Sequence, residues 1–305
     1  TLPLTLFPYT TLFRSGELFL AEINSKKFDV VVTHFVELCN SFYKQVKNNS
    51  KPYIIAVDHN PRPLKGFPLK KRLKNKLKGI IYSRYIDCFV GVSKYTADCI
   101  LQDYGSKLRK KTQVVYNGID TGVYLKRSEE NVGKFIVASH LRESKGLQDL
   151  IEAVHLLADD LKNKLSIDIY GEGPMEGELK ARVRNYNLER HINFKGSSSH
   201  LPEIFQAYFY LVQPTYMECF SLSILESLAA NVPVITTQVG GNREVILPGE
   251  NGFIFQAGDI EGLRRILEKV LLRELRIEND VSSKIEQEFS LEQMVEAHLK
   301  LLPCI

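Results

Sequence analysis

The chain has 305 residues, 44% of them hydrophobic, which is enough for two α/β domains with separate cores. Its 40 Lys and Arg against 36 Asp and Glu give a net charge of +4, too near balance to indicate a nucleic-acid-binding protein. Five scattered cysteines without C-x-x-C spacing argue against a disulfide framework and a zinc site, and favour a reducing cytoplasm. No apolar run approaches the roughly 20 residues that span a bilayer, so membrane contact is expected to be peripheral at most.

The first fifteen residues, TLPLTLFPYTTLFRS, lack the basic start and the small-residue cleavage site of a signal peptide. They resemble a translated sequencing-adapter tail. We therefore expect residues 1–15 to be non-native and to replace natural N-terminal sequence, so that the chain is an N-terminally truncated copy.

Short β-branched runs alternate with longer amphipathic stretches from Phe28 onwards, which predicts a parallel, doubly wound sheet. The predicted strands are FDVVVTHF, PYIIAVDH, DCFVGVS and TQVVYNG, and the helices between them are LKKRLKNKLKGIIYSRY and KYTADCILQDYG. The polar, turn-rich segment NGIDTGVYLKRSEENVG predicts a linker. We assign residues 16–125 to a first, incomplete Rossmann-like domain.

The alternation begins again after the linker and predicts a second Rossmann-like domain at residues 126–290. Its strands are predicted at KFIVASH, SIDIYGEG, HINFKG, FYLVQP and VPVITT, and its helices at KGLQDLIEAVHLLADDL, MEGELKARVRNYN and SLSILESLAA. In residues 291–305, apolar side chains at helical spacing predict a packed C-terminal helix through Leu291, Met294, Val295 and Leu299.

Two glutamates, Glu218 and Glu226, stand eight positions apart in PTYMECFSLSILESLAANVPV, directly after a predicted strand. A helix beginning near Ser221 would direct its free N–H groups at the preceding turn, which suits a diphosphate. Both carboxylates then face a crevice at the carboxyl edge of the sheet and suit a hydroxyl-rich ligand. The alternative is a capping box between Ser223 and Glu226, with Glu218 on the surface.

The same stretch resembles the E-x7-E signature of retaining family 4 glycosyltransferases, P-S-x-x-E-G-F-G-x-x-x-x-E-A-x-A-x-G-x-P-V. The resemblance implies the GT-B fold, in which two Rossmann-like domains face a cleft. It also implies that Glu218 contacts hydroxyls of the transferred sugar and that Glu226 holds the nucleotide ribose. The diphosphate would meet amides of Phe220, Ser221, Leu222 and Ser223. Cys219, Ser221 and Asn231 stand where the family commonly has glycine, so their side chains narrow the crevice.

A second segment, ASHLRESKG, resembles the family's G-R-L-x-x-x-K-G pattern, whose Arg and Lys face the donor diphosphate. Lys145 occupies the Lys position, although on its own it would pass for a solvated residue near a helix start. His140 occupies the Arg position, and a neutral imidazole supplies only one donor, so Arg142 is the alternative second cation. Such fixed cations stabilise a leaving diphosphate where no metal is used.

Two glycine pairs follow predicted strands, Gly171 with Gly173, and Gly240 with Gly241 shortly before Glu244. Taken alone, glycines at strand ends often only make turns. Their order follows the family, in which they line the nucleotide pocket.

Candidate acceptor-side residues lie in the first domain, where Asp58 and His59 end a strand. Related enzymes often carry a histidine near here, so His59 is a candidate active-site residue, with a strand-capping role as the alternative. His34 has a similar position after the preceding strand. The family's glycine-rich loop after the first strand is absent from this sequence.

A strongly basic helix is predicted after His59, with apolar residues at helical spacing. One interpretation places it on anionic lipid, which suits a lipid-linked acceptor, and the other makes it a domain helix with a solvated charged face. Nucleic-acid binding is disfavoured because few aromatic residues interleave the charges. The residues concerned are Lys65, Lys70, Lys71, Arg72, Lys74, Lys76 and Lys78, among Leu69, Leu73, Leu77, Ile80 and Ile81.

These features predict a metal-independent, retaining glycosyltransferase that uses a UDP- or GDP-sugar and no cofactor. The acceptor is expected to be a saccharide or a lipid-linked molecule, in cell-surface polysaccharide or glycolipid synthesis. Two alternatives stay open, a nucleotide-sugar epimerase of the same architecture and a non-catalytic, nucleotide-binding fragment.

Overall fold

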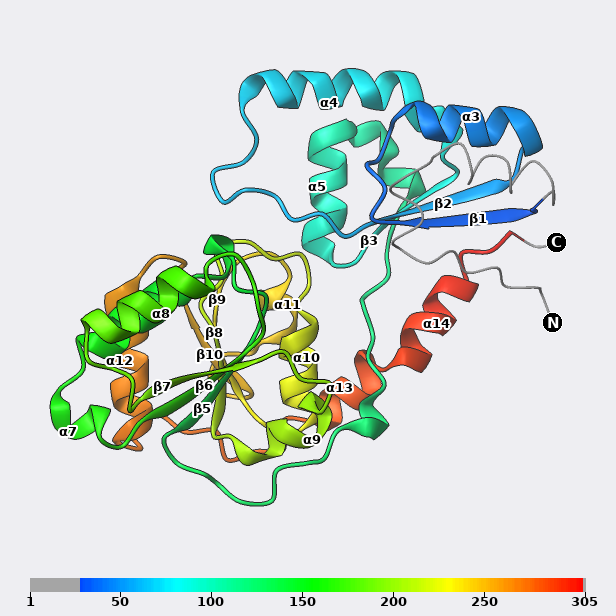
Figure 1. Ribbon diagram of the computed structural model, residues 1–305. Coiled ribbons are helices and arrows are strands. Elements are labelled where there is room, and N and C mark those ends of the chain that lie inside the picture. The colour runs from blue at the N-terminus through cyan, green and yellow to red at the C-terminus, as the bar shows by residue number, and fades with distance from the viewer. Residues whose placement is uncertain (1–27, 304–305) are drawn as a thin grey trace.

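The computed structural model describes residues 28–303, which form two α/β units and a C-terminal helix (Figure 1). The adapter-like segment expected at residues 1–15 lies outside the described residues. Within the described part of the chain, no helix is both long enough and apolar enough to cross a membrane.

The first unit is a parallel four-stranded sheet with the order β1-β2-β3-β4. The residues of β2 and β3 are almost all buried, which is typical of a parallel sheet covered on both faces. Its strands are β1 (Val30–His34), β2 (Tyr53–Asp58), β3 (Cys88–Gly91) and β4 (Thr112–Val114), and its helices are α3 (Ser41–Ser50), α4 (Leu69–Tyr82) and α5 (Lys94–Tyr104).

The second unit is a parallel six-stranded sheet with the order β10-β9-β8-β5-β6-β7. The chain first builds outward from β5 to β7, returns to place β8 beside β5, and then builds outward on the other side. Strand β10 has no counterpart among the predicted strands. The strands are β5 (Lys134–Ala138), β6 (Ser166–Tyr170), β7 (Ile192–Gly196), β8 (Tyr210–Gln213), β9 (Val234–Thr237) and β10 (Gly252–Phe255).

Helices connect these strands and cover the sheet (Figure 1). The single helix expected from Lys145 to Leu161 is wrong. Gly146 has a left-handed backbone (φ 70°) and separates a short 3-10 turn, Glu143–Lys145, from the helix that follows, and that helix ends at His155, before a second one at Asp159–Lys162. The helices are α6 (Leu147–His155), α7 (Asp159–Lys162), α8 (Glu176–Asn185), α9 (Leu201–Ile204), α10 (Leu222–Ala229), α11 (Asn242–Val245), α12 (Ile260–Leu271) and α13 (Ser283–Glu288).

The last helix, α14 (Leu291–Leu299), runs from the second unit back towards the first (Figure 1, red). The expectation that Leu291, Val295 and Leu299 are packed is wrong, since all three side chains are exposed. The contacts are made instead by the face that carries Met294, whose sulfur accepts a hydrogen bond from the Gly118 amide.

Candidate active site

Two of the predicted residues, Lys145 and Glu218, meet at the carboxyl edge of the second sheet. Lys145 follows β5 and Glu218 follows β8. These two strands are adjacent in the sheet, and the strands after β5 are added on one side of the pair while those after β8 are added on the other. Helices leave such a point in opposite directions and open a crevice, which is where ligands bind in doubly wound sheets. The Lys145 Nζ donates to Glu218 Oε2 over 2.7 Å, and the side chains are only 22% and 16% exposed.

The two turns that carry this ion pair are held together by their backbones. The amide of Tyr216 and the hydroxyl of Thr215 both donate to the carbonyl oxygen of Ser144, over 2.8 and 3.0 Å. A Cβ on Gly146 would lie 1.9 Å from the carbonyl oxygen of Pro214, so only glycine permits this approach. The relative position of Lys145 and Glu218 is therefore set by the backbone.

Helix α10 begins directly after the turn that carries Glu218. Ser221 is its N-cap, and the Ser221 hydroxyl accepts from the Ile224 amide over 3.4 Å. The helix begins near Ser221 as predicted, and the alternative, a capping box between Ser223 and Glu226, is not formed because Ser223 already lies inside the first helical turn. The amides of Leu222 and Ser223 are in that turn, where helix geometry supplies no carbonyl partner.

Glu226 lies in the second turn of α10 and is partly buried. Burial raises the pKa of its carboxyl group, while a hydrogen bond from the Tyr124 hydroxyl in the linker lowers that pKa in part. Within residues 28–303, Glu226 makes no hydrogen bond or ion pair with Lys145 or Glu218. The two glutamates of the E-x7-E segment therefore have different partners, one a cation and the other a phenol.

The predicted residues at the ends of β5 and β6 form a second pair of touching turns. A Cβ on Gly171 (φ 132°) would lie 1.9 Å from the carbonyl oxygen of Ser139, and one on Gly173 would lie 2.4 Å from that of Leu141. Both glycines thus allow the β6 turn to pack against the β5 turn that carries His140 and Arg142. These last two side chains are exposed, and neither forms an ion pair with another described residue.

The turn after β8 also contacts the first unit. The Ser93 hydroxyl donates to the Cys219 carbonyl oxygen, and the Cys219 thiol donates to the His59 carbonyl oxygen, each over 3.1 Å. Burial raises the pKa of the Cys219 thiol, so it is protonated and acts as a donor. Cys219 stands where the family commonly has glycine, and here its side chain links the Glu218 turn to the end of β2.

Glu244 makes the most extensive polar contact between the units. Its carboxylate accepts hydrogen bonds from the amides of Lys94 and Tyr95 at the start of α5 and from the Tyr116 hydroxyl, all over 2.9 Å. The sequence placed Glu244 near the predicted nucleotide pocket, and this contact with α5 was not predicted. One feature of the sequence pointed to it: α5 has no acidic residue in its own first turn. A helix N-terminus favours negative charge, so a carboxylate from elsewhere in the chain could be expected there.

His59 lies at the carboxyl end of β2, with its Nε2 atom 2.9 Å from Nδ1 of His34. Burial, with a further contribution from His34, lowers the pKa of His59 to about 4, so the imidazole is neutral at pH 7. The strand-capping role considered for His59 belongs to Asp58, whose carboxylate accepts from the Asn60 amide. Within residues 28–303, no three His, Cys, Asp or Glu side chains are grouped to hold a metal ion.

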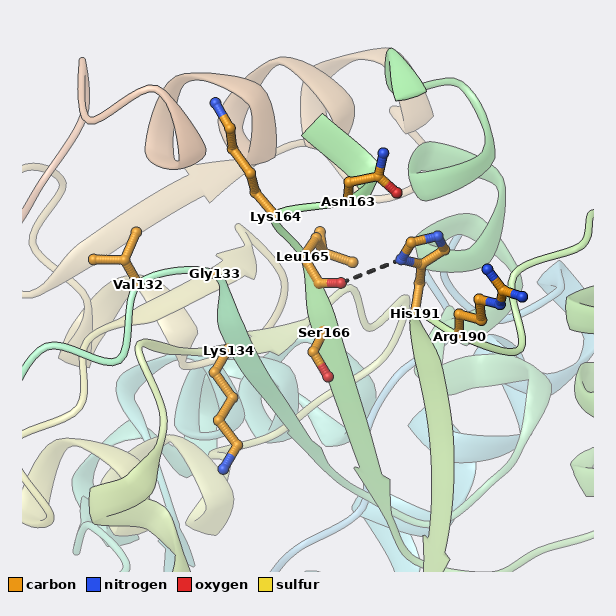
Figure 2. A pocket seen from close by; sticks show the side chains of 9 residues that line it. All are labelled: Val132, Gly133, Lys134, Asn163, Lys164, Leu165, Ser166, Arg190 and His191. Atoms are coloured by element: carbon orange, nitrogen blue, oxygen red, sulfur yellow. Dashed lines mark hydrogen bonds between the residues drawn. The ribbon is translucent and has the colours of Figure 1, made fainter. Parts of the chain in front are cut away.

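A separate basic pocket lies at the opposite edge of the second sheet, where β5, β6 and β7 begin (Figure 2). His191 contacts the carbonyl oxygen of Leu165 over 3.4 Å in its wall. The pocket contains none of the predicted site residues, so it is not part of the site around Lys145. It is lined by Val132, Gly133, Lys134, Asn163, Lys164, Leu165, Ser166, Arg190 and His191.

Solved structures with the same architecture are known. Anabaena HepE in complex with UDP and glucose superimposes with a TM-score of 0.79 and 17% identity, over 98% of this chain and 84% of that one. Sucrose-phosphate synthase from Thermosynechococcus elongatus gives a TM-score of 0.76 and 18% identity, over 98% and 80%. At these identities the likeness establishes the fold, which is GT-B.

Sequence comparisons agree with the fold. The chain is 31% identical over 167 residues to N-acetyl-alpha-D-glucosaminyl L-malate synthase of Bacillus anthracis, covering 52% of this chain and 43% of that protein. It is 27% identical over 262 residues to an uncharacterised glycosyltransferase of Methanocaldococcus jannaschii, covering 83% and 69%. The match to the first relative thus spans less than half of that protein's length.

Two family models cover most of the chain. The model described as glycosyltransferase family 4 matches residues 2–123. The model described as glycosyl transferases group 1 matches residues 125–287, more than half of the chain, and includes the turns of Lys145 and Glu218 together with α10. The chain therefore belongs to the glycosyl transferases group 1 family.

Proposed function

We propose that this chain transfers a sugar from a nucleoside-diphosphate sugar to an acceptor hydroxyl, with retention of configuration at the anomeric carbon. One observation carries the proposal: a lysine and a glutamate are fixed 2.7 Å apart at the switch point of the second sheet, beside the start of α10. A diphosphate needs cations and free amides, and a sugar needs carboxylate acceptors. Both kinds of group converge at this crevice.

Catalysis in this proposal consists of positioning the donor and stabilising charge. As the bond from the anomeric carbon to the diphosphate breaks, negative charge grows on the leaving oxygen. The Lys145 ammonium and the amides of Leu222 and Ser223 stabilise that charge. The Glu218 carboxylate accepts hydrogen bonds from the sugar hydroxyls and holds the ring so that the acceptor attacks from the face that the diphosphate leaves.

The other candidate residues take supporting roles. Glu226 binds the ribose, and either His140 or Arg142 supplies a second cation to the diphosphate. Gly171 and Gly173 bring the nucleotide pocket close to these turns. His59, on the first unit, faces the acceptor side. The reaction as proposed requires no metal ion and no cofactor.

The donor is a UDP- or GDP-sugar that carries a hexose-type unit, and the acceptor is a saccharide or a lipid-linked molecule. The HepE structure that contains UDP and glucose makes UDP-glucose the first donor to test. Family membership supports transfer over epimerisation. Epimerisation would convert a nucleotide sugar without any acceptor, and a non-catalytic fragment would bind UDP or GDP without turnover.

The test is to compare Lys145→Ala and Glu218→Gln with the parent chain, or with a version extended at its N-terminus, in a transfer assay with a panel of nucleotide sugars. Loss of one preorganised donor to a developing anion costs about 10²–10³ in kcat, so we expect a decrease of that size in Lys145→Ala. In Glu218→Gln, kcat should fall at least roughly tenfold, because the glutamine amide is uncharged and accepts hydrogen bonds from the sugar hydroxyls more weakly than the carboxylate does.

Matched controls come from a surface ion pair elsewhere in the second unit, Lys126 with Glu286, whose side chains are 50% and 41% exposed. Lys126→Ala and Glu286→Gln remove the same chemical groups and should leave turnover unchanged. Equal turnover in Lys145→Ala, Glu218→Gln and these controls would rule out the proposed mechanism. Binding of UDP or GDP by calorimetry without any transfer would instead support the non-catalytic alternative.

A further inference from the structure

Helix α4 packs on the first unit with its polar side inward. An amphipathic helix normally turns its apolar stripe to the core, but the buried residues of α4 are Asn75 and Gly79. A Cβ on Gly79 would lie 2.0 Å from the Tyr104 carbonyl oxygen, so the α4 backbone rests directly on the end of α5. Lys78, on the same side, donates to Glu37 over 2.7 Å. This inner face fixes the orientation of the helix.

The apolar stripe of α4 therefore faces away from the protein. Leu69 is 69% exposed, Leu73 59%, Leu77 60% and Ile80 76%, and Leu64 in the preceding loop is 62% exposed. In Figure 1, α4 runs along the upper edge of the first unit with no other labelled element beyond it. An exposed apolar surface of this extent marks an interaction site. The charged residues of α4 are solvated, as in a domain helix with a solvated charged face, but the apolar residues that such a helix would turn to the core are exposed as well.

Basic residues border the stripe on both sides. With 100° between successive residues of an α-helix, Arg72 and Lys76 lie along one border, and Lys70 and Lys74 lie along the other. None of these four forms an ion pair with a carboxylate among residues 28–303. From Pro63 to Tyr82 the sequence has seven Lys and Arg and no Asp or Glu. The free surface of α4 is thus an apolar strip between two cationic rows.

We propose that α4 docks this surface on an anionic lipid bilayer. The apolar side chains enter the boundary between headgroups and acyl chains, while the bordering lysines and the arginine contact lipid phosphates and carboxylates. A second copy of this chain fits less well, because packing two such stripes together would bring cationic rows against each other. An anionic bilayer supplies both an apolar interior and negative charge.

Docking would also place the candidate site near the lipid. The loop from His59 to Pro68 connects the carboxyl end of β2 to α4, and Arg62 in this loop is held by Asp58 over 2.7 Å and by Asp103 over 2.8 Å. A membrane on the outer face of α4 is thus one ordered loop away from His59. A lipid-linked acceptor would be held close to His59 in this arrangement. That assignment of the acceptor rests on the proposed transferase function, whereas the docking of α4 on the bilayer does not.

The first experiment measures co-sedimentation of the chain with vesicles of phosphatidylcholine alone and with vesicles of phosphatidylcholine and phosphatidylglycerol, because anionic lipid gives the surface the negative potential that attracts basic segments. We expect binding only to the anionic vesicles, weaker at high salt because surface charges are screened. Replacement of Leu73, Leu77 and Ile80 by Gln should abolish binding. These side chains are exposed and Gln is a good helix former, so the fold is retained.

Charge is tested separately with Lys70→Gln, Lys74→Gln and Lys76→Gln in one variant, which should weaken binding roughly a hundredfold, at about fivefold for each lysine. The control replaces Lys107, Arg109 and Lys110 by Gln. These residues lie in an exposed 3-10 turn of the same unit and carry the same total charge. If both triple variants bound vesicles equally weakly, the loss of binding would follow from the lower net charge alone, and docking through α4 would be overturned.

A second measurement uses the fact that the sequence contains no tryptophan. Leu77→Trp places a single fluorophore in the stripe, and Leu156→Trp places one at an exposed position in the second unit. We expect a blue shift and quenching by brominated lipid in Leu77→Trp only. No shift in that variant with anionic vesicles would refute the proposal. A blue shift that depends on protein concentration without lipid would show that a second copy covers the face.

Because both measurements omit nucleotide sugar, they distinguish failure of docking from failure of the transferase assignment.

Discussion

Replacement of Glu244 provides a direct test of how the two units are held together. Its carboxylate accepts three hydrogen bonds of 2.9 Å from groups of the first unit or linker, two of them at the start of α5. In Glu244→Ala the amides of Lys94 and Tyr95 lose their acceptor, the α5 dipole loses a favourable charge, and the partly buried Tyr116 hydroxyl loses its partner.

The magnitude follows from these three contacts. Hydrogen bonds to charged groups contribute about 1.5–3 kcal/mol each, but water replaces part of the loss at the exposed amide of Lys94, so a sum of three maximal values is too large. We expect Glu244→Ala to lower the free energy of unfolding by about 3 kcal/mol. Glu244→Gln keeps an acceptor oxygen and loses the charge, which predicts about half of that effect.

The assay is urea unfolding followed by circular dichroism, together with calorimetry. Because the contact joins two units, its loss should also separate one cooperative transition into two. Arg243→Ala is the control: the Arg243 side chain is exposed and makes no hydrogen bond or ion pair within residues 28–303, so a change below about 0.5 kcal/mol is expected. A Glu244→Ala variant as stable as Arg243→Ala, with an unchanged transition, would refute the reasoning.

Two further predictions concern pH. The pKa of Glu226 is raised in the folded state, so its contribution to stability is present at low pH and is lost as pH rises through that pKa. Glu226→Gln keeps an acceptor for Tyr124 and should raise Tm relative to the parent at pH 7 but not at pH 4; a pH-independent difference would contradict this. The pKa of His59 is lowered from 6.5 to about 4, so its contribution, roughly 3 kcal/mol, is complete above pH 6.5 and is lost as pH falls to about 4. NMR titration of the His59 ring should give a midpoint well below 6, and a midpoint near 6.5 would contradict the partly buried, neutral imidazole.

Much of the candidate site could be predicted from sequence because its residues lie in local patterns. A strand, a turn and a helix start follow one another within a dozen residues around Glu218, and the same holds for Lys145. Both segments end strands of a parallel sheet, whose carboxyl ends share one edge. The contact between Lys145 and Glu218 depends in addition on β5 lying beside β8, which the order of the strands along the chain does not specify.

Contacts between the two units could not be predicted in the same way. Glu244 and the amide of Lys94 are 150 positions apart, and a carboxylate that caps a distant helix has no local sequence signature. The same reason applies to the hydrogen bond from Cys219 to His59. From sequence, Cys219 was only a departure from a glycine position, whereas in the structure its thiol joins the units.

The sequence by itself determined the alternation of strands and helices, the two Rossmann-like units and the segments that carry the site, because periodicity and turn chemistry act over a few neighbouring residues. Tertiary structure decided which face of each helix is covered. For α4 and α14 the apolar stripes are evident in the sequence but lie largely exposed in the structure. An amphipathic pattern shows that a helix has two different faces, and only packing against the rest of the chain decides which of them meets the core.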